Sequence, residues 1–359
     1  MSEIEKFRKE IDKLDEAIIE LLNKRGDLAK KIGDLKNKEN IEVFQPKRER
    51  KIIERMKSLS KILNPNSIES IWKEIIGACR AIQGSIFRVG YLGPQGTFTH
   101  QAALEFFPNA STDFYPCKNL LEIFNNIEKD ILDFGVIAIE NSLEGTVMET
   151  LDLLIEKNLK IYGELELRII QNLISIKDTS LSLVKDVYSH PQALAQSRTW
   201  LKINLPNANL INTESTAEAV HKIKELNNPI NAAIGTEFAS KMYDLKILTS
   251  KIEDNPSNYT RFLIISKKEN EVKTDKMKTS LVFVTKHIPG ALYRVLKIFA
   301  EANINLTKIE SRPRRSGRWE YIFLMDFEGI KSDPKISNAL EVMKDQVIWF
   351  KILGSYPFA

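Results

Sequence analysis

The sequence predicts three successive parts of different fold class: an all-α part, an α/β part and an α+β part. Three observations support this prediction. An apolar stripe with spacings of three and four runs through much of the first 84 residues. Short apolar runs typical of buried strands alternate with helical patterns between residues 87 and 265. After a charged segment at 268–278, the order strand, helix, strand, strand, helix, strand is typical of a ferredoxin-like sheet.

Length and composition exclude several classes of protein. With 359 residues, the chain is expected to form two or three domains. Its 43% hydrophobic and 28% charged residues exclude a disordered chain, and its short apolar runs exclude a membrane span. Two cysteines, Cys79 and Cys117, exclude a disulfide framework, so we expect a reducing cytoplasm. The net charge of +4 resides in residues 1–84, with 19 Lys/Arg against 15 Asp/Glu, so no long basic stripe for nucleic acid is predicted.

The first segment reads as one long helix whose apolar stripe contains an arginine. The stripe consists of Ile4, Phe7, Ile11, Leu14, Ile18, Leu21, Leu28, Ile32 and Leu35. A helix from Ile4 to Leu35 is about 48 Å long at 1.5 Å per residue, too long to bury its stripe within one small domain. We therefore expect a second copy of the chain to cover it. Arg25 occupies the stripe position between Leu21 and Leu28.

Polar groups also interrupt the apolar faces of two further predicted helices, one from Pro46 to about Leu59 and one that ends at Gly84. The polar residues on or beside the three stripes are Arg8, Arg25, Lys36, Arg48, Glu49 and Gln83. Uncompensated burial of a charge costs several kcal/mol, so we predict that a small dicarboxylate binds between the helices. The alternative for Arg25 is a register-setting residue or one that extends to water.

These residues resemble the all-helical chorismate mutase family. The matching runs are Phe7-Arg8-Lys9-Glu10-Ile11, Leu14-Asp15, Leu22-Asn23-Lys24-Arg25, Leu28-Ala29, Lys36, Pro46-Lys47-Arg48-Glu49, and Cys79 with Gln83. The resemblance implies that three helices of one chain interlock with those of a second. It also implies that Arg25 and Arg48 bind substrate carboxylate and that Arg8 enters from the second copy. Lys36 and Gln83 would hydrogen-bond the ether oxygen, and Glu49 a substrate hydroxyl.

The reaction implied is the pericyclic rearrangement of chorismate to prephenate. It needs only a compact conformer and stabilisation of negative charge on the ether oxygen. At the edge of this pocket, Gln45 replaces an acidic residue and Cys79 replaces a serine of the best-known family member.

The middle segment predicts a mostly parallel sheet with helices on its faces. The strand-like runs are 87–92, 134–139, 186–189, 231–234 and 262–265. Ligands in such sheets lie beyond the carboxyl ends of the strands, where polar motifs occur here. Each motif alone is typical of a helix cap, and several helix N-termini at one crevice favour an anion site. Pro94 interrupts the glycine spacing that a dinucleotide fingerprint requires.

Residues 86–267 resemble the prephenate dehydratase family. The matching motifs are Gly-Pro-Gln-Gly-Thr-Phe-Thr (93–99), Glu-Asn-Ser-Leu-Glu-Gly-Thr (140–146), Ser-His-Pro-Gln (189–192), Glu-Ser-Thr (214–216) and Asn-Tyr-Thr-Arg-Phe (258–262). The resemblance implies two lobes of periplasmic-binding-protein type, from 86 to about 165 with 258–267, and from about 166 to 257. The site would lie between them.

The dehydratase resemblance implies loss of hydroxide and carbon dioxide from prephenate, with Thr260 assisting the departing hydroxyl. Asn141, Ser142, Ser189, Gln196 and Arg261 would bind the substrate. For Arg261 a structural salt bridge is an equal alternative. We interpret His190 as a residue at the start of a helix rather than a base.

The last segment follows residues 268–278, which we interpret as a charged linker. Two motifs, Pro289-Gly290-Ala291-Leu292 and Glu310-Ser311-Arg312-Pro313, resemble the ACT regulatory domain. This implies phenylalanine bound between two such domains at Gly290, Ala291, Leu292, Glu310, Ser311, Arg312 and Pro313. The arginines near Ser316-Gly317, namely Arg312, Arg314, Arg315 and Arg318, predict a solvated hairpin tip.

Together the motifs resemble the bifunctional chorismate mutase–prephenate dehydratase family over nearly the whole chain. The expected domains are 1–84, 85–267 and 279–359, with a linker at 268–278. We expect a cytoplasmic enzyme of phenylalanine biosynthesis that acts on chorismate and prephenate, responds to L-phenylalanine and forms a homodimer or higher homo-oligomer. No metal, nucleotide or covalent cofactor, nucleic acid or membrane is implied.

Two alternatives stay open from the sequence. The first is a non-catalytic anion or amino-acid sensor that uses its helices only to dimerise. The second is a mutase joined to an NAD-dependent prephenate dehydrogenase, which the missing dinucleotide fingerprint disfavours.

Overall fold

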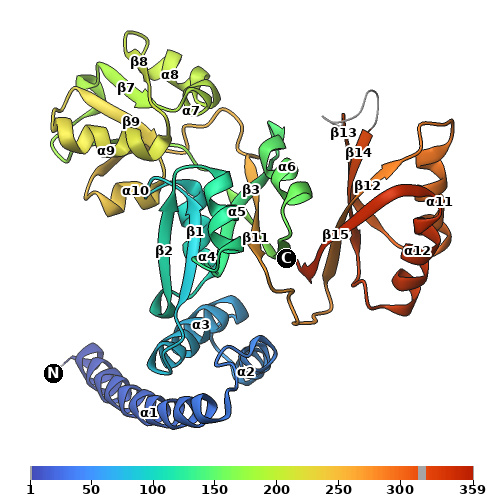
Figure 1. Ribbon diagram of the computed structural model, residues 1–359. Helices are drawn as coiled ribbons and strands as arrows, with labels where there is room; N and C mark the ends of the chain where they lie inside the picture. Colours follow the sequence, from blue (N-terminus) through green and yellow to red (C-terminus); the bar gives the residue numbers. More distant parts are fainter. Residues whose placement is uncertain (1, 314–320, 359) are drawn as a thin grey trace. The chain divides into compact units, whose positions relative to one another are not determined.

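A computed structural model describes residues 2–313 and 321–358 (Figure 1). Its helical unit comprises the first 88 residues and residues 107–113. The unit contains α1 (Glu3–Glu39), α2 (Pro46–Leu59), α3 (Pro65–Ile82) and the short 3₁₀ helix η1 (Asn109–Ser111). The side chains of Ser2 and Glu5 form a capping box at the start of α1, and Asn40 ends the helix in the left-handed conformation.

The predicted apolar stripe of α1 lies on the surface of the single chain. Its side chains are half or more exposed, from Ile32 at 50% to Leu21 at 64%. Near the C-terminal end of α1, Gly33 is buried against Gln83, the residue that follows α3. A Cβ atom at Gly33 would lie 2.7 Å from Cγ of Gln83, so the glycine allows α1 and the end of α3 to approach closely.

The second unit begins with a mixed sheet in the order β2-β1-β3-β11-β5, and β4 pairs with β3. Its strands are β1 (Phe87–Leu92), β2 (Thr112–Cys117), β3 (Phe134–Asn141), β4 (Gly145–Thr146), β5 (Lys160–Arg168) and β11 (Tyr259–Ser266). The accompanying helices are α4 (Phe98–Phe106), α5 (Leu120–Glu128) and α6 (Met148–Glu156).

Residues 172–250 form a second sheet in the order β10-β6-β9-β7-β8. Its strands are β6 (Asn172–Ser175), β7 (Asp186–Ser189), β8 (Asn209–Asn212), β9 (Asn231–Gly235) and β10 (Lys246–Ser250). The helices are η2 (Leu181–Leu183), α7 (Pro191–Gln196), α8 (Arg198–Asn204), α9 (Thr216–Leu226) and α10 (Glu237–Met242). These two sheets form the two predicted lobes, and Figure 1 shows each with its own helices.

The expectation of mostly parallel sheets was wrong. Strand β1 pairs with β3 in parallel, and β7 pairs in parallel with β8 and β9. In contrast, β11 is antiparallel to β3 and β5, and β6 is antiparallel to β9 and β10. The reason is topological. The chain leaves the first lobe after β5 and returns in β11, so the neighbouring strands β5 and β11 run in opposite directions.

The C-terminal segment forms an antiparallel sheet in the order β13-β14-β12-β15 with two helices. Its elements are β12 (Met277–Thr285), α11 (Ala291–Glu301), β13 (Leu306–Pro313), β14 (Tyr321–Glu328), α12 (Pro334–Lys344) and β15 (Val347–Pro357). The predicted fold class, all-α, then two-lobed α/β, then α+β, is confirmed. Arg314, Arg315 and Arg318 of the predicted hairpin tip lie outside the described residues.

Both faces of the C-terminal sheet are covered. One face forms a core with α11 and α12, which includes Phe283, Phe299 and Met343. The other face shares a core with the first lobe, in which Val282 and Leu324 join residues such as Ile137 and Ile161. Gly354 approaches the first lobe so closely that a Cβ atom there would lie 2.3 Å from the carbonyl oxygen of Ile161. Among the described residues, no helix is long and apolar enough to cross a membrane.

Candidate active sites and effector site

The three helices of the first unit enclose a cavity of about 380 Å³. Seven of the eight predicted mutase residues line it: Arg25, Lys36, Gln45, Arg48, Glu49, Cys79 and Gln83. The eighth, Arg8, lies in the opposite half of α1, about 25 Å from Arg25 along the helix axis at 1.5 Å per residue. The cavity therefore contains the predicted constellation without Arg8 of the same chain.

Arg25 points into the helical unit rather than to water. Its Nη1 donates to Sγ of Cys79 at 2.6 Å and to the carbonyl oxygen of Ile75 at 3.3 Å. Its guanidinium also lies 5.7 Å from the ring centroid of Trp72. The half-buried side chain is thus held by α3, which favours the binding interpretation over a side chain that extends to solvent.

Lys36 is the second cation from α1, and its Nζ donates to the carbonyl oxygen of Val43 at 2.9 Å. Burial lowers the pKa of Lys36; Glu49 acts against this shift and Arg48 reinforces it. The ammonium group therefore borders the cavity in a partly desolvated setting. Electrostatic attraction to an anion is stronger there than in bulk water.

Glu49 is the acidic residue of the cavity, and sequence reasoning missed its partner, Arg80. Nη1 of Arg80 donates to both carboxylate oxygens of Glu49 at 3.1 Å. Burial raises the pKa of Glu49, while Arg80, Lys36 and Arg25 act to lower it. The available signal was the position of Arg80 four residues after the buried Ile76, on the same helix face.

The second polar cluster lies where β3 and β11 pair, with Asn141 opposite Thr260. Nδ2 of Asn141 lies 2.9 Å from Oγ1 of Thr260 and 2.8 Å from Oδ1 of Asn258. Nδ2 of Asn258 donates to Oε1 of Gln196 at 3.1 Å, and Nε2 of Gln171 lies 3.4 Å from the same oxygen. A chain of amides thus joins the two lobes at Thr260.

The hydrogen bonds of Asn141 determine how Thr260 can act. Its Oδ1 accepts from the backbone N–H groups of Leu143 and Glu144 at 3.0 and 3.2 Å, which fixes the orientation of the amide. Nδ2 must therefore face Thr260 and donate to its hydroxyl oxygen. The hydroxyl proton of Thr260 is then available to donate to a ligand oxygen.

The remaining predicted dehydratase residues differ in their placement. Ser142 adjoins the cluster, since its hydroxyl donates to the carbonyl oxygen of Ser257 and accepts from the N–H of Tyr259, both at 2.9 Å. Ser189 is fully buried and donates to the carbonyl oxygen of Ile234 at 2.8 Å, so its recorded bond does not join the amide chain. His190 caps α7 by accepting from the N–H of Gln192, as interpreted from the sequence.

Arg261 faces away from Thr260, because the two residues are consecutive in β11 and successive side chains of a strand point to opposite faces. Its Nη2 lies 2.6 Å from Oε2 of Glu164 and 2.7 Å from Oδ2 of Asp326. Burial alone would lower the pKa of Arg261, but Asp326, Tyr356 and Glu164 raise it above its ordinary value. The structure thus places Arg261 in ion pairs between the first lobe and the C-terminal sheet.

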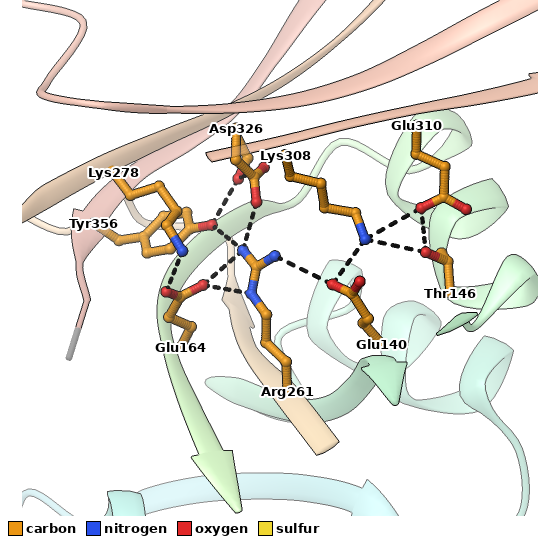
Figure 2. Close-up of polar contacts among 10 residues, drawn as sticks. Glu140, Thr146, Glu164, Arg261, Lys278, Lys308, Glu310, Asp326 and Tyr356 are labelled. Atoms are coloured by element: carbon orange, nitrogen blue, oxygen red, sulfur yellow. Dashed lines mark hydrogen bonds and ion pairs between the residues drawn. The ribbon is translucent and has the colours of Figure 1, made fainter. Parts of the chain in front are cut away.

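Further ion pairs extend this network along β12 and β13 (Figure 2). Nζ of Lys278 lies 2.7 Å from Glu164, and Nζ of Lys308 lies 2.7 Å from Glu140. Glu310 accepts a hydrogen bond from Thr146. Glu140 and Thr146 flank the Asn141-Ser142 motif, so the C-terminal sheet contacts the loop that carries predicted dehydratase residues.

A cavity of about 450 Å³ lies beside α11 and contains one of the two predicted effector motifs. It is lined by residues 285–293, which include Gly290, Ala291 and Leu292, and by Tyr321 and Phe323 of β14, which sequence reasoning missed. Gly290 adopts a φ of 73° at the N-cap of α11.

The second effector motif, residues 310–313, lies on β13 beside this cavity. Ser311 and Pro313 pair with Phe323 and Tyr321 of the cavity wall. The side chains of Glu310 and Arg312 instead face the first lobe, where Arg312 forms an ion pair with Asp152 of α6. The structure therefore brings Gly290–Leu292 together in one cavity and directs two residues of the other motif elsewhere.

The three parts of the chain match three protein families. Residues 7–84 match chorismate mutase type II, residues 89–270 match prephenate dehydratase and residues 279–344 match the ACT domain. A bifunctional chorismate mutase/prephenate dehydratase of Aquifex aeolicus is 43% identical over 364 residues, covering 100% of this chain and 99% of the relative. The chain belongs to the family of bifunctional chorismate mutase/prephenate dehydratases.

Two further comparisons agree with this family. The protein of the same description from Pseudomonas aeruginosa is 38% identical and covers 99% of this chain and 98% of its own length. The crystal structure of prephenate dehydratase from Arthrobacter aurescens in complex with L-Phe has 33% identity and a TM-score of 0.69. It covers 76% of this chain and 90% of that chain.

Proposed function

We propose that this chain catalyses two successive reactions in phenylalanine biosynthesis, at two separate sites. The helical cavity rearranges chorismate to prephenate, and the cluster at Asn141 and Thr260 converts prephenate to phenylpyruvate. The observation that carries the proposal is the convergence of Arg25, Lys36 and Glu49 on one cavity of about 380 Å³. The cavity is lined by four cations, Arg25, Lys36, Arg48 and Arg80, and by one carboxylate, that of Glu49. Such a site matches a substrate with two carboxylates and a hydroxyl.

In the first reaction the protein acts by binding and electrostatics. Arg25 and Arg48 bind the carboxylates and hold the compact conformer, which lowers the entropic part of the barrier. Lys36 and Gln83 donate hydrogen bonds to the ether oxygen, on which negative charge develops as its carbon–oxygen bond breaks. Glu49 accepts a hydrogen bond from the substrate hydroxyl, and Gln45 and Cys79 complete the wall of the cavity.

The mutase site is completed by a second copy of the chain. The stripe of α1 exposes residues such as Phe7 and Leu21, 58% and 64% exposed, which is typical of a helix that packs against a partner. Arg8 is about 25 Å from Arg25 along α1, so it reaches a cavity only in another copy. We therefore propose a homodimer or higher homo-oligomer in which each cavity receives Arg8 of the second copy.

In the second reaction prephenate loses carbon dioxide and hydroxide. The electron pair of the bond to the departing carboxylate enters the ring, which becomes aromatic as the hydroxide leaves. The hydroxyl of Thr260 donates a hydrogen bond to the leaving oxygen, and Asn141 holds Thr260 in the donating orientation. Gln196 and Ser142 position the substrate. Ser189 supports β7 and β9, and Arg261 supports the strand that carries Thr260.

L-phenylalanine is the proposed effector, and it binds at the cavity of residues 285–293 beside Ser311 and Pro313. Its signal reaches Thr260 through β13 and the ion pairs of Figure 2, which join the C-terminal sheet to β3 and β11. A coupling free energy of about 1 to 3 kcal/mol is typical of such regulation. We propose functional segments at 1–84, 85–267 and 279–359, with a linker at 268–278 between the last two. We also propose a cytoplasmic location.

The test follows chorismate, prephenate and phenylpyruvate in the purified full chain, with and without NAD and L-phenylalanine. The proposal predicts that chorismate disappears, phenylpyruvate forms without NAD, and L-phenylalanine changes the dehydratase rate. Binding of chorismate without turnover would instead support a sensor that uses its helices to dimerise. Turnover that requires NAD would support the dehydrogenase alternative.

A further inference from the structure

Arg80 is a buried cation of the helical unit whose two Nη atoms both donate hydrogen bonds. Its side chain is 3% exposed, and besides its two bonds to Glu49 its Nη2 donates to Oγ of Ser111 at 2.7 Å. The guanidinium also lies 4.0 Å from the ring centroid of Phe87 and 5.2 Å from that of Phe44. Two rings, a carboxylate and a hydroxyl thus determine its position. Such a guanidinium has little freedom to follow a ligand.

Glu49 needs a counter-charge that does not serve the substrate. The other charged groups that act on this carboxylate are Arg25 and Lys36 of α1, and Arg48 precedes it on α2. Under the proposed function, the three other cations bind the carboxylates and ether oxygen of chorismate. If Arg80 were removed, Glu49 would turn to Arg25 or Lys36 and compete with the substrate for them.

We propose that Arg80 is a positioning residue of the mutase reaction. It holds the carboxylate of Glu49 so that this carboxylate accepts a hydrogen bond from the substrate hydroxyl, while Arg25 and Lys36 stay available to bind the substrate. The inference rests on the proposed mutase activity and adds a residue to that site. Arg80 acts through Glu49 and not on the reacting atoms. Burial raises the pKa of Glu49, and Arg80 acts against this rise, so Arg80 favours the ionised form of the carboxylate.

The test compares Arg80→Met and Arg80→Lys with Arg50→Met in the full chain, by the pH dependence of mutase kcat/KM. Arg50 is a matched control, since it pairs with Glu54 and Glu69 of the same helical unit and does not line the cavity. Arg80→Met should lower kcat/KM about tenfold or more near neutral pH, the loss expected for a charge-assisted hydrogen bond. The acidic limb of its profile should move to higher pH. Arg80→Lys, which keeps the charge, should recover part of the activity.

A second measurement separates positioning from folding. In a Glu49→Gln background, Arg80→Met should change kcat/KM by less than about twofold, because the group through which Arg80 acts is already altered. Dehydration of supplied prephenate reports whether the dehydratase part of each variant is intact. Arg80→Gln, which also removes the charge, provides the same pH test if Arg80→Met does not fold. An equal loss in both backgrounds, or a profile like that of Arg50→Met, would overturn the inference. A wild-type chain that does not convert chorismate would overturn the proposed function as well.

Discussion

The ion pair between Arg261 and Asp326 gives a quantitative test of how the C-terminal sheet is joined to the first lobe. The two side chains are 11% and 2% exposed, and their charged atoms are 2.7 Å apart. Removal of one partner from a buried pair costs about 3 to 5 kcal/mol. Asp326→Leu should cost about 3 kcal/mol of unfolding free energy, the lower end, because Glu164 still pairs with Arg261 at 2.6 Å.

Arg261→Met should cost about 5 kcal/mol, since it leaves Asp326 buried without its guanidinium partner. The double variant should cost less than the sum of the two, because Lys278 and Glu164 then balance one another at 2.7 Å. The four charges form two opposite pairs, and removal of one of each sign keeps this group neutral. We expect a coupling free energy of about 3 kcal/mol from the double-mutant cycle.

The assay is urea unfolding of the full chain, and the free energy is taken from the transition in which the dehydratase lobes and the C-terminal sheet unfold. The matched control is a cycle on Lys331 and Glu269, which are paired at 2.6 Å with 37% and 43% of their side chains exposed. That cycle should give no more than about 1 kcal/mol. Additive losses for Arg261 and Asp326 would refute the reasoning. Asp326→Leu should also weaken the response of the dehydratase rate to L-phenylalanine.

Three further predictions concern single residues. Arg25→Ala should reduce mutase kcat/KM at least about a hundredfold, because a charged hydrogen-bonding partner of the substrate is lost, while dehydration of supplied prephenate continues; equal loss of both activities would contradict the assigned site. Thr260→Val should stop phenylpyruvate formation while prephenate accumulates from chorismate, and an unchanged rate would remove Thr260 from the mechanism. Nδ1 of His100 accepts from the N–H of Gly96 at 3.2 Å, and burial lowers the pKa of His100 to about 4. The unfolded chain takes up this proton near pH 6.5, so stability should fall by about 3 kcal/mol as the pH decreases from 6.5 to 4, and His100→Asn should not show this loss, as measured by urea unfolding at each pH.

Local sequence patterns were enough to predict most elements. The second helix was predicted at the residues where α2 begins and ends, because Pro46 starts it and the helical spacing continues to Leu59. The six elements after residue 276 were predicted in the right order. Strands such as β2, β6, β8 and β10 were missed, since they are four to six residues long and lack a distinct alternation. Strand β5 was also missed, and β11 was predicted without its antiparallel direction, because that direction depends on a connection through the second lobe.

Within the candidate sites, helix spacing predicted which residues share a face but not which partners they meet. Arg25 was identified because its position belongs to the apolar stripe of α1, and it does point inward. Arg80 was missed because its partners, Glu49 and Ser111, are both 31 residues away in the sequence. Tyr321 and Phe323 were missed as cavity residues because their spacing of two is the same as in any strand. Nothing in the local sequence shows that this face of β14 borders a cavity.

Local sequence patterns were sufficient to locate most helices, several strands and the side chains that break an apolar face, because these properties follow from periods of 3.6 and 2 residues along a short stretch of chain. The folded chain was needed to show that Glu49 pairs with Arg80, that Arg261 faces Asp326, and that Arg312 faces Asp152. These pairs join segments far apart in the chain. Long-range packing selects such partners, and no local sequence period specifies which residues they are.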